Sequence, residues 1–257
     1  MMKRFFVIAL FVLGFGQLYA QPVRDTAWTK AGYFGLKLTQ VSLSSWSAGG
    51  ESALAFDSQI TYSADFKRDR QLWQNRLELG YGLTKNDGKS ARKTNDKIYF
   101  ASTYGYQIYK TLYWSALLNF NTQFAKGYDY NIEDSDFISK FMAPGYLMIG
   151  TGVTWSPNKI FTATFTPASW RGTIVADSRL SDEGAFGVDK GKHLLSEFGA
   201  NLKAEVNYEF LPNMKVYSRL ELYSNYLKDP QNIDVRWEVQ LNMAINKWFS
   251  TTLSTNL

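Results

Sequence analysis

The feature that most constrains the fold is a strict alternation of apolar and polar side chains in the C-terminal quarter of the chain. Three stretches carry it, separated by short turn sequences: 198–209, 215–225 and 234–246. A period of two places successive side chains on opposite faces of a β-strand. Each of these predicted strands therefore has one apolar face and one face that carries full charges.

The apolar faces need a partner, because a sheet in water buries its apolar face under a second layer. No helical pattern in the chain offers that layer, so lipid is the simplest solvent for it. No internal apolar run reaches the roughly 18 residues of a spanning helix, and the mean hydropathy of −0.27 is too low for a helix bundle. The aromatic content of 16% suits a barrel with aromatic girdles. We expect an all-β, antiparallel up-and-down transmembrane β-barrel; the alternative is an aromatic-rich soluble sandwich.

The N-terminus predicts export. Lys3 and Arg4 precede the apolar segment 5–15, and Leu18-Tyr19-Ala20 resembles a cleavage site. We interpret 1–20 as a signal peptide, 21–31 as a periplasmic lead-in and 32–257 as the barrel. Export combined with strand alternation predicts the bacterial outer membrane as the location.

Strand patterns recur along the rest of the chain at the length that a tilted membrane strand needs. With the three stretches above, the predicted strands are 32–45, 52–63, 71–84, 98–108, 112–124, 146–155, 160–175 and 249–257. Short turns alternate with longer loops, as in outer-membrane barrels. The loops 85–97, 125–144 and 176–193 would be external. Pro167 removes a ladder donor and predicts a bulge or a kink in its strand.

The strand count is about eleven, whereas bacterial single-chain barrels have even numbers. Alternation is still in progress at Leu257. We therefore expect the natural protein to continue past Leu257 and to form a barrel of about twelve strands.

Short motifs connect the chain to a known family. Leu38-Thr39-Gln40-Val41, the following Ser42–Gly50 segment and Thr166-Pro167-Ala168-Ser169 resemble the DUF3078 family of Bacteroidota proteins of unknown function. The resemblance implies an outer-membrane barrel that usually extends beyond the point matching Leu257. Because the family has no established activity, the resemblance transfers no catalytic residue.

Charged side chains of both signs fall on the predicted lumen face. These are Lys37, Asp57, Arg76, Glu78, Lys203, Glu205, Arg219, Glu221, Arg236 and Glu238. Cross-strand neighbours lie about 5 Å apart, so these charges can pair. The pairs would either form a lattice that fills and props a narrow barrel, or line a charged constriction that selects solutes. A catalytic carboxylate pair is a third interpretation.

Enzymatic and metal chemistry have little support. The chain has no Cys and a single histidine, His193, with Ser196 and Glu197 nearby. A rim hydrolase would need a His-activated Ser, but no G-x-S-x-G motif is present, and we expect no enzyme. The acidic loops around Asp129 and Asp182 lack EF-hand spacing, so we expect no metal and no cofactor.

Two surface features suggest contacts. The turn containing Trp46, Gly49 and Gly50 is short and apolar, with glycines that permit positive φ, and is either a partner motif or a tight girdle turn. The basic loop 85–97 would meet lipid phosphates or simply solvent. A net charge of +5 gives no basis for nucleic-acid binding.

Taken together, the sequence predicts a narrow channel or small-solute-binding barrel with a charged lumen. The alternative is a structural or accessory subunit of a larger outer-membrane complex, with a plugged lumen. Under either interpretation, the partners of the protein would be outer-membrane lipid and lipopolysaccharide, with other outer-membrane proteins as further candidates.

Overall fold

The fold is described here for residues 27–43, 50–132, 136–244 and 249–257 of a computed structural model. The predicted signal peptide, most of the lead-in, Trp46 and Gly49 lie outside these residues. One antiparallel sheet of eleven strands dominates, in the order β1-β2-β3-β4-β5-β8-β9-β10-β11-β12-β13. The first strands are β1 (Trp28–Val41), β2 (Ala53–Arg68), β3 (Gln71–Asn86), β4 (Arg92–Tyr109) and β5 (Leu112–Thr122). The others are β8 (Gly145–Trp155), β9 (Phe161–Ile174), β10 (Leu194–Leu211), β11 (Met214–Asn225), β12 (Ile233–Ala244) and β13 (Ser250–Asn256).

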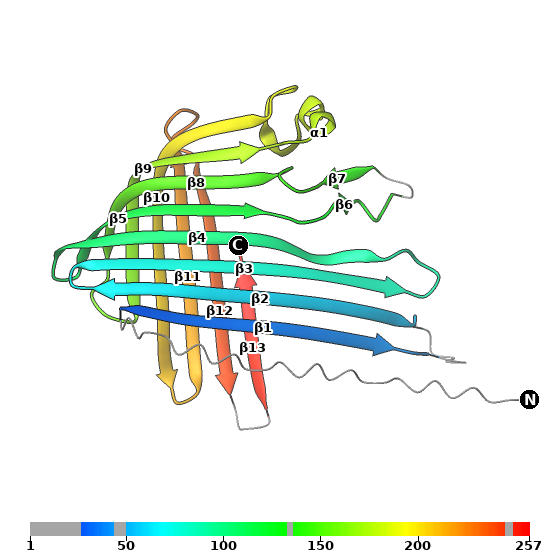
Figure 1. Ribbon diagram of the computed structural model, residues 1–257, viewed down its shortest axis with the longest axis horizontal. Coiled ribbons are helices and arrows are strands. Elements are labelled where there is room, and N and C mark those ends of the chain that lie inside the picture. The colour runs from blue at the N-terminus through cyan, green and yellow to red at the C-terminus, as the bar shows by residue number, and fades with distance from the viewer. Residues whose placement is uncertain (1–26, 44–49, 133–135, 245–248) are drawn as a thin grey trace, which may run out of the picture.

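The sheet curls so that its two halves face each other. In Figure 1, β1 to β5, β8 and β9 form a near wall, and β10 to β13 cross behind it. β1 and β13 are the two edge strands of the sheet, and among the described residues they are not hydrogen-bonded neighbours. Because every neighbouring pair is antiparallel and the strands number eleven, the two edges run in the same direction. The structure thus gives an all-β protein with the predicted strand number, as a curled and open sheet.

Connections at one end of the strands are tight. β2 and β3 are joined by Asp69-Arg70, and β10 and β11 by Pro212-Asn213. Asp69 (φ 52°) and Asn213 (φ 66°) adopt the left-handed region, which Asp and Asn tolerate better than most residues. We call this end of the sheet the turn end.

The opposite end, the loop end, carries secondary structure where the sequence predicted plain loops. The 125–144 segment contains the small β6–β7 ladder (Gly127–Tyr128 and Phe137–Ser139). The 176–193 segment contains α1 (Ser178–Glu183) and η1 (Ala185–Gly187). These elements enclose a small apolar core of Ala143, Val175, Leu180 and Val188. Burying those side chains fixes the two segments against each other.

Helix α1 begins at a charged cap. The Asp177 carboxylate accepts the Leu180 backbone N–H at 3.0 Å and pairs with Lys140 at 2.5 Å. The hydrogen bond from Lys140, reinforced by that from Leu180, lowers the pKa of Asp177 below its ordinary value. This ion pair joins Lys140, the residue after β7, to the N-terminus of α1.

Several boundary predictions need correction; for example, β2 ends at Arg68 rather than at residue 63, and β10 begins at Leu194 rather than at residue 198. β1 begins at Trp28 rather than at residue 32, inside the predicted lead-in. β4 begins at Arg92 rather than at residue 98 and β3 extends to Asn86, so most of the predicted basic loop 85–97 is strand. The apolar–polar alternation is absent there because polar side chains occupy both faces of the first part of β4.

Strand β9 bulges at the predicted position. Gly199 of β10 aligns with Ser169 and Asn201 aligns with Thr166, so β9 carries one extra residue around Pro167. The register on the β8 side shifts at the same place, between Thr151 and Val153. A bulge accommodates the missing proline donor and increases the local bend of the sheet.

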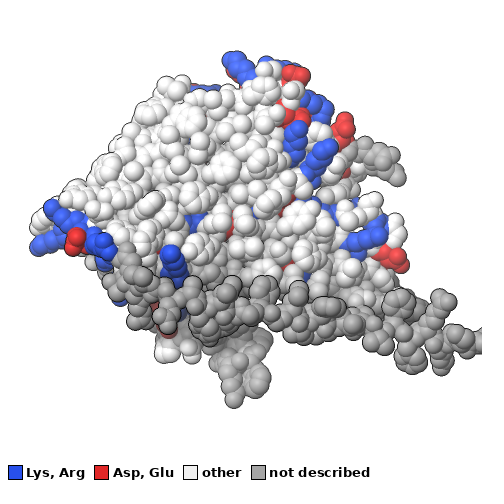
Figure 2. Space-filling model, viewed as in Figure 1, with Lys and Arg blue, Asp and Glu red and all other residues white. Residues whose placement is uncertain are grey.

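The convex face of the sheet is apolar. Its exposed side chains include Phe34, Leu38, Ile60, Trp114, Phe165 and Trp237. Figure 2 shows the near part of this face almost free of Lys, Arg, Asp and Glu, which gather at its ends. None of the helices in the described residues is long and apolar enough to cross a membrane.

Three tryptophans of the convex face donate their indole N–H to serines on neighbouring strands. Trp73 donates to Ser102 at 2.8 Å, Trp170 to Ser196 at 2.6 Å and Trp237 to Ser218 at 3.0 Å. Each pair lies diagonally across two strands, on the same face. The polar atom of each indole therefore has a partner within the sheet itself.

Candidate functional site

The concave face encloses a cavity of about 970 Å³. Strands β3, β4 and β5 line one side of it, and β10, β11 and β12 line the other. Segments more than one hundred positions apart in the chain thus meet across a shared space, because the sheet curls. We call this space the concave cavity.

On the first wall, a carboxylate holds two cations. Glu78 of β3 lies 2.5 Å from Arg76 of the same strand and 2.5 Å from Lys97 of β4. Arg76 and Glu78 face the same side because they are two residues apart in a strand. Lys97 was placed in an external loop by the sequence interpretation. It lies in β4, where it lines the cavity beside Tyr99.

On the second wall, charges alternate across three strands. The register sets Lys203 opposite Glu221, Glu205 opposite Arg219, Arg219 opposite Glu238 and Glu221 opposite Arg236. The ion pairs follow this register in part: Arg219 lies 3.3 Å from Glu205 and 3.8 Å from Glu238, and Arg236 lies 3.9 Å from Glu221. Lys203 instead pairs along its own strand with Glu205 at 3.3 Å. Lys203, Glu205, Arg219 and Glu238 form one connected network, and Arg236 and Glu221 form a separate pair beside it.

A tyrosine completes that network. Arg219 donates from Nε to the Tyr217 hydroxyl at 2.8 Å, and this hydroxyl donates to Glu205 at 3.1 Å. Tyr217 is not among the residues that the sequence predicts for the lumen, although it lies two residues before Arg219 and hence on the same face. The period-two rule applied to polar aromatic residues, and not only to charges, would have found it.

The remaining two predicted charges lie nearer the loop end. Lys37 and Asp57 are register partners on β1 and β2. Asp57 accepts a hydrogen bond from Asn95 of β4 at 3.0 Å, and a smaller cavity of about 390 Å³ lies beside both residues. The structure therefore separates this pair from the network of the concave cavity.

Above the cavity, towards the loop end, the second wall is close-packed. Thr166, Asn201 and Tyr223 are aligned on β9, β10 and β11 and are all buried. Arg171 lies over the Tyr223 ring, 3.5 Å from its centroid. The hydroxyls of Thr166 and Tyr223 are buried and have no hydrogen-bond partner within the described residues. We call Thr166, Ser169, Asn201 and Tyr223 the packed layer.

The residues of the hydrolase hypothesis do not come together. His193 Nδ1 lies 2.7 Å from the Val175 carbonyl oxygen. Ser196 accepts from Trp170 on the convex face, whereas Glu197 accepts from Asn225 on the concave face. Adjacent residues of an extended strand point in opposite directions, so Ser196 and Glu197 cannot share one site.

Within the described residues, no group of three or more His, Cys, Asp or Glu side chains is placed to hold a metal ion.

The predicted glycine turn is described at Gly50. This residue has φ 129°, and a Cβ at this position would lie 2.7 Å from Leu43. Only glycine fits there, whereas Trp46 and Gly49 lie outside the described residues.

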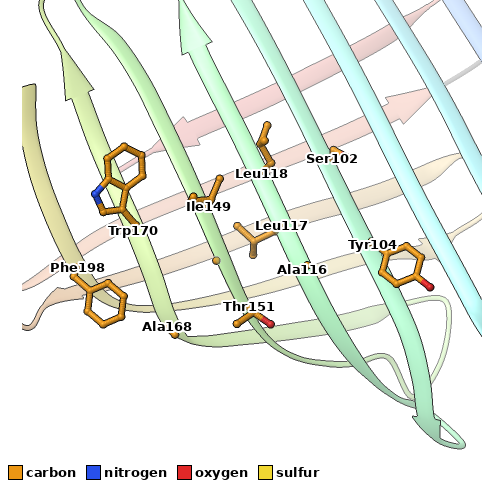
Figure 3. Close-up of a pocket in the computed structure, with 11 residues that line it drawn as sticks. Ser102, Tyr104, Ala116, Leu117, Leu118, Ile149, Thr151, Ala168, Trp170 and Phe198 are labelled. Atoms are coloured by element: carbon orange, nitrogen blue, oxygen red, sulfur yellow. The ribbon is translucent and has the colours of Figure 1, made fainter.

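A third hollow, of about 590 Å³, lies on the convex face. Figure 3 shows Ile149 and Leu117 in its centre, with Trp170, Phe198 and Ala168 towards one side and Ala116 and Tyr104 towards the other. Its lining is predominantly apolar. This groove thus continues the uncharged surface of Figure 2.

The strand order, the apolar convex face and the charged concave face define an all-β protein built on one large antiparallel sheet. Within that class, residues 38–128 match the family model described as "Protein of unknown function (DUF3078)". This match confirms the resemblance drawn from the Leu38–Gly50 motifs; the later motif at Thr166 lies outside the matched residues. No curated protein and no solved structure matches the chain.

Proposed function

We propose that this chain is a non-enzymatic β-barrel of the bacterial outer membrane, whose lumen is a narrow channel or binding cavity for small solutes. One observation carries the proposal: the near part of the convex face is almost free of charge, while the concave face holds an ion-paired cavity of about 970 Å³. A sheet of this kind is stable when lipid covers its outside and water fills its inside.

The Trp–Ser hydrogen bonds support the membrane part of the proposal. Hydrocarbon offers no water to an indole N–H, so a buried donor without a partner costs several kcal/mol in order of magnitude. Trp73, Trp170 and Trp237 each have a serine partner on the neighbouring strand. Outer-membrane lipid and lipopolysaccharide would then surround the convex face.

Fluorescence quenching tests the location of the convex face. The protein is reconstituted into vesicles whose acyl chains carry bromine, and its tryptophan emission is compared with that in unbrominated vesicles. We expect strong quenching by bromine and weak quenching by aqueous iodide. Emission that iodide quenches strongly and bromine leaves unchanged would contradict a lipid-facing surface.

Conductance tests the lumen. Purified protein in a planar bilayer should conduct small ions above background. Asn207 lines the concave cavity, so Asn207→Trp should reduce the conductance, whereas Gln231→Trp in the exposed β11–β12 loop should not. Absence of conductance, together with absence of solute binding in detergent, would sink the proposal.

A second candidate is an accessory subunit of an outer-membrane complex, with a plugged lumen. The packed layer and the satisfied charge network favour it, because both occupy lumen space. Crosslinking in intact cells followed by purification would decide. A stoichiometric outer-membrane partner combined with zero conductance favours the accessory role, and a conducting, partner-free protein removes it.

A further inference from the structure

We infer that the concave cavity selects small anionic solutes, such as those that carry a carboxylate or phosphate group. This inference rests on the proposed function, since it requires a lumen that solutes reach. It names the class of solute that the proposed function leaves open.

The first argument is the balance of charge at the cavity wall. Six cationic side chains line the cavity: Arg76, Lys97, Lys159, Lys203, Lys215 and Arg219. Four carboxylates oppose them: Glu78, Glu205, Glu221 and Glu238. Just beyond the lining, Glu209 pairs with Lys215 and Arg236 pairs with Glu221, and these two contributions cancel. Two positive charges remain in excess.

The second argument is which partner of each ion pair faces the cavity. Glu78 is covered, with 14% of its side chain exposed, whereas its partners Arg76 and Lys97 are 57% and 48% exposed. On the opposite wall the same order holds: Glu205 is 26% exposed, and its partners Lys203 and Arg219 are 37% and 40% exposed. A solute in the cavity therefore meets the cations before it meets the carboxylates.

The third argument is where the excess charge lies. Lys159 follows β8 in a turn-end connection and extends the cationic lining to that end. A low-dielectric wall around a narrow space focuses the field of its charges. An anion that enters from the turn end thus meets an attractive potential first at Lys159 and then at Arg76 and Lys97. Amides such as Asn119 and Gln240 line the same space and can donate to further oxygens.

Thiol modification measures this potential without requiring conductance. The chain has no cysteine, so Asn119→Cys introduces a single thiol into the cavity. Its rates of reaction with a sulfonate-bearing and a trimethylammonium-bearing methanethiosulfonate are compared, each divided by the rate for a free thiol. A positive potential of one kT would favour the sulfonate reagent about sevenfold. Gln231→Cys, in the exposed β11–β12 loop, is the matched control, with an expected ratio near one.

Removal of cations should lower the ratio. Lys159→Gln removes one exposed cation without breaking an ion pair among the described contacts, and in the Asn119→Cys background it should reduce the preference by roughly half or more. Arg76→Gln combined with Lys97→Gln should bring the ratio near one. Lys228→Gln removes a cation outside the cavity and should leave the ratio unchanged. Raising the salt concentration should shrink the ratio in every responsive variant.

The outcomes separate the two proposals. A ratio at Asn119→Cys that equals one or favours the ammonium reagent overturns anion selection, while rapid reaction still shows an accessible lumen. If Gln231→Cys reacts and Asn119→Cys reacts with neither reagent, the cavity is closed to solutes. That result overturns the inference and the proposed channel together.

Discussion

The concave cavity and the packed layer lie on the same strands and the same face, yet one is open and the other is filled. Along β10, buried Asn201 is followed two residues later by Lys203 and four residues later by Glu205. Along β11, buried Tyr223 comes two residues after Glu221. A step of about 7 Å along a strand thus separates a close-packed interior from a cavity.

Two glycines explain why the packed layer is filled. A Cβ at Gly150 would lie 2.6 Å from the Thr166 methyl group, and one at Gly199 would lie 3.1 Å from Tyr223 Cζ. The absent side chains leave the space that Thr166 and Tyr223 occupy. On the open side, Arg76, Glu78 and Lys97 satisfy one another along the sheet surface, so they need not reach across to the opposite wall. The packed layer forms where glycines leave room for the side chains of neighbouring strands. The concave cavity stays open where charged side chains pair with neighbours on their own wall.

The largest expected effect comes from filling a glycine gap. Gly199→Ala would place Cβ 2.0 Å from the Ser224 carbonyl oxygen, and we expect it to lower the free energy of unfolding by about 3 kcal/mol. Gly105→Ala is the matched control on the concave face, because its nearest atoms are 3.7 Å away, and it should change stability by less than about 1 kcal/mol. Urea unfolding in detergent measures both. Equal effects would mean that the packed layer is no tighter than its surroundings.

A smaller effect is expected from the open side. Glu78→Gln leaves Arg76 and Lys97 together without their shared carboxylate, and should lower the free energy of unfolding by about 1–2 kcal/mol. Glu209→Gln breaks the more exposed pair with Lys215, whose atoms are 3.5 Å apart, and should cost less than about 0.5 kcal/mol. The same unfolding measurement applies. If Glu78→Gln costs nothing, the first-wall charges are fully solvated and the distinction between the two carboxylates is lost.

The smallest effect tests how dry the packed layer is. The Tyr223 hydroxyl is buried without a partner in the described structure, so Tyr223→Phe should change the free energy of unfolding by about 0.5 kcal/mol or less, while the ring stays under Arg171. Tyr217→Phe is the comparison, because that hydroxyl bonds to both Arg219 and Glu205, and it should cost about 1 kcal/mol. A loss at Tyr223→Phe as large as at Tyr217→Phe would reveal a water or solute on the buried hydroxyl.

Period-two alternation was enough to predict the strands, their number and the two faces, and the missing backbone donor of Pro167 was enough to predict an irregularity in its strand. The alternation failed where polar residues occupied both faces, as at the start of β4, and this misplaced Lys97. It also gave no sign of α1, whose six residues are too short for a helical period to emerge. The packed layer could not be predicted, because burial of Tyr223 depends on Gly199 in the neighbouring strand and on curvature that no local pattern encodes. For the same reason, the sequence could name the charges of the concave face but not which of them would be covered.

The shared direction of β1 and β13 has a consequence for anything that joins them. Direct pairing of the two edges would need the slanted hydrogen bonds of a parallel ladder, in a sheet whose every other ladder is antiparallel. A segment that pairs antiparallel with both edges must instead run from the loop end to the turn end. The chain direction of such a segment is therefore fixed by the two edges. Its side chains would need to alternate, with apolar residues on the convex face and polar residues on the concave face. The gap between the edges of β1 and β13 therefore accepts an antiparallel strand in one direction only.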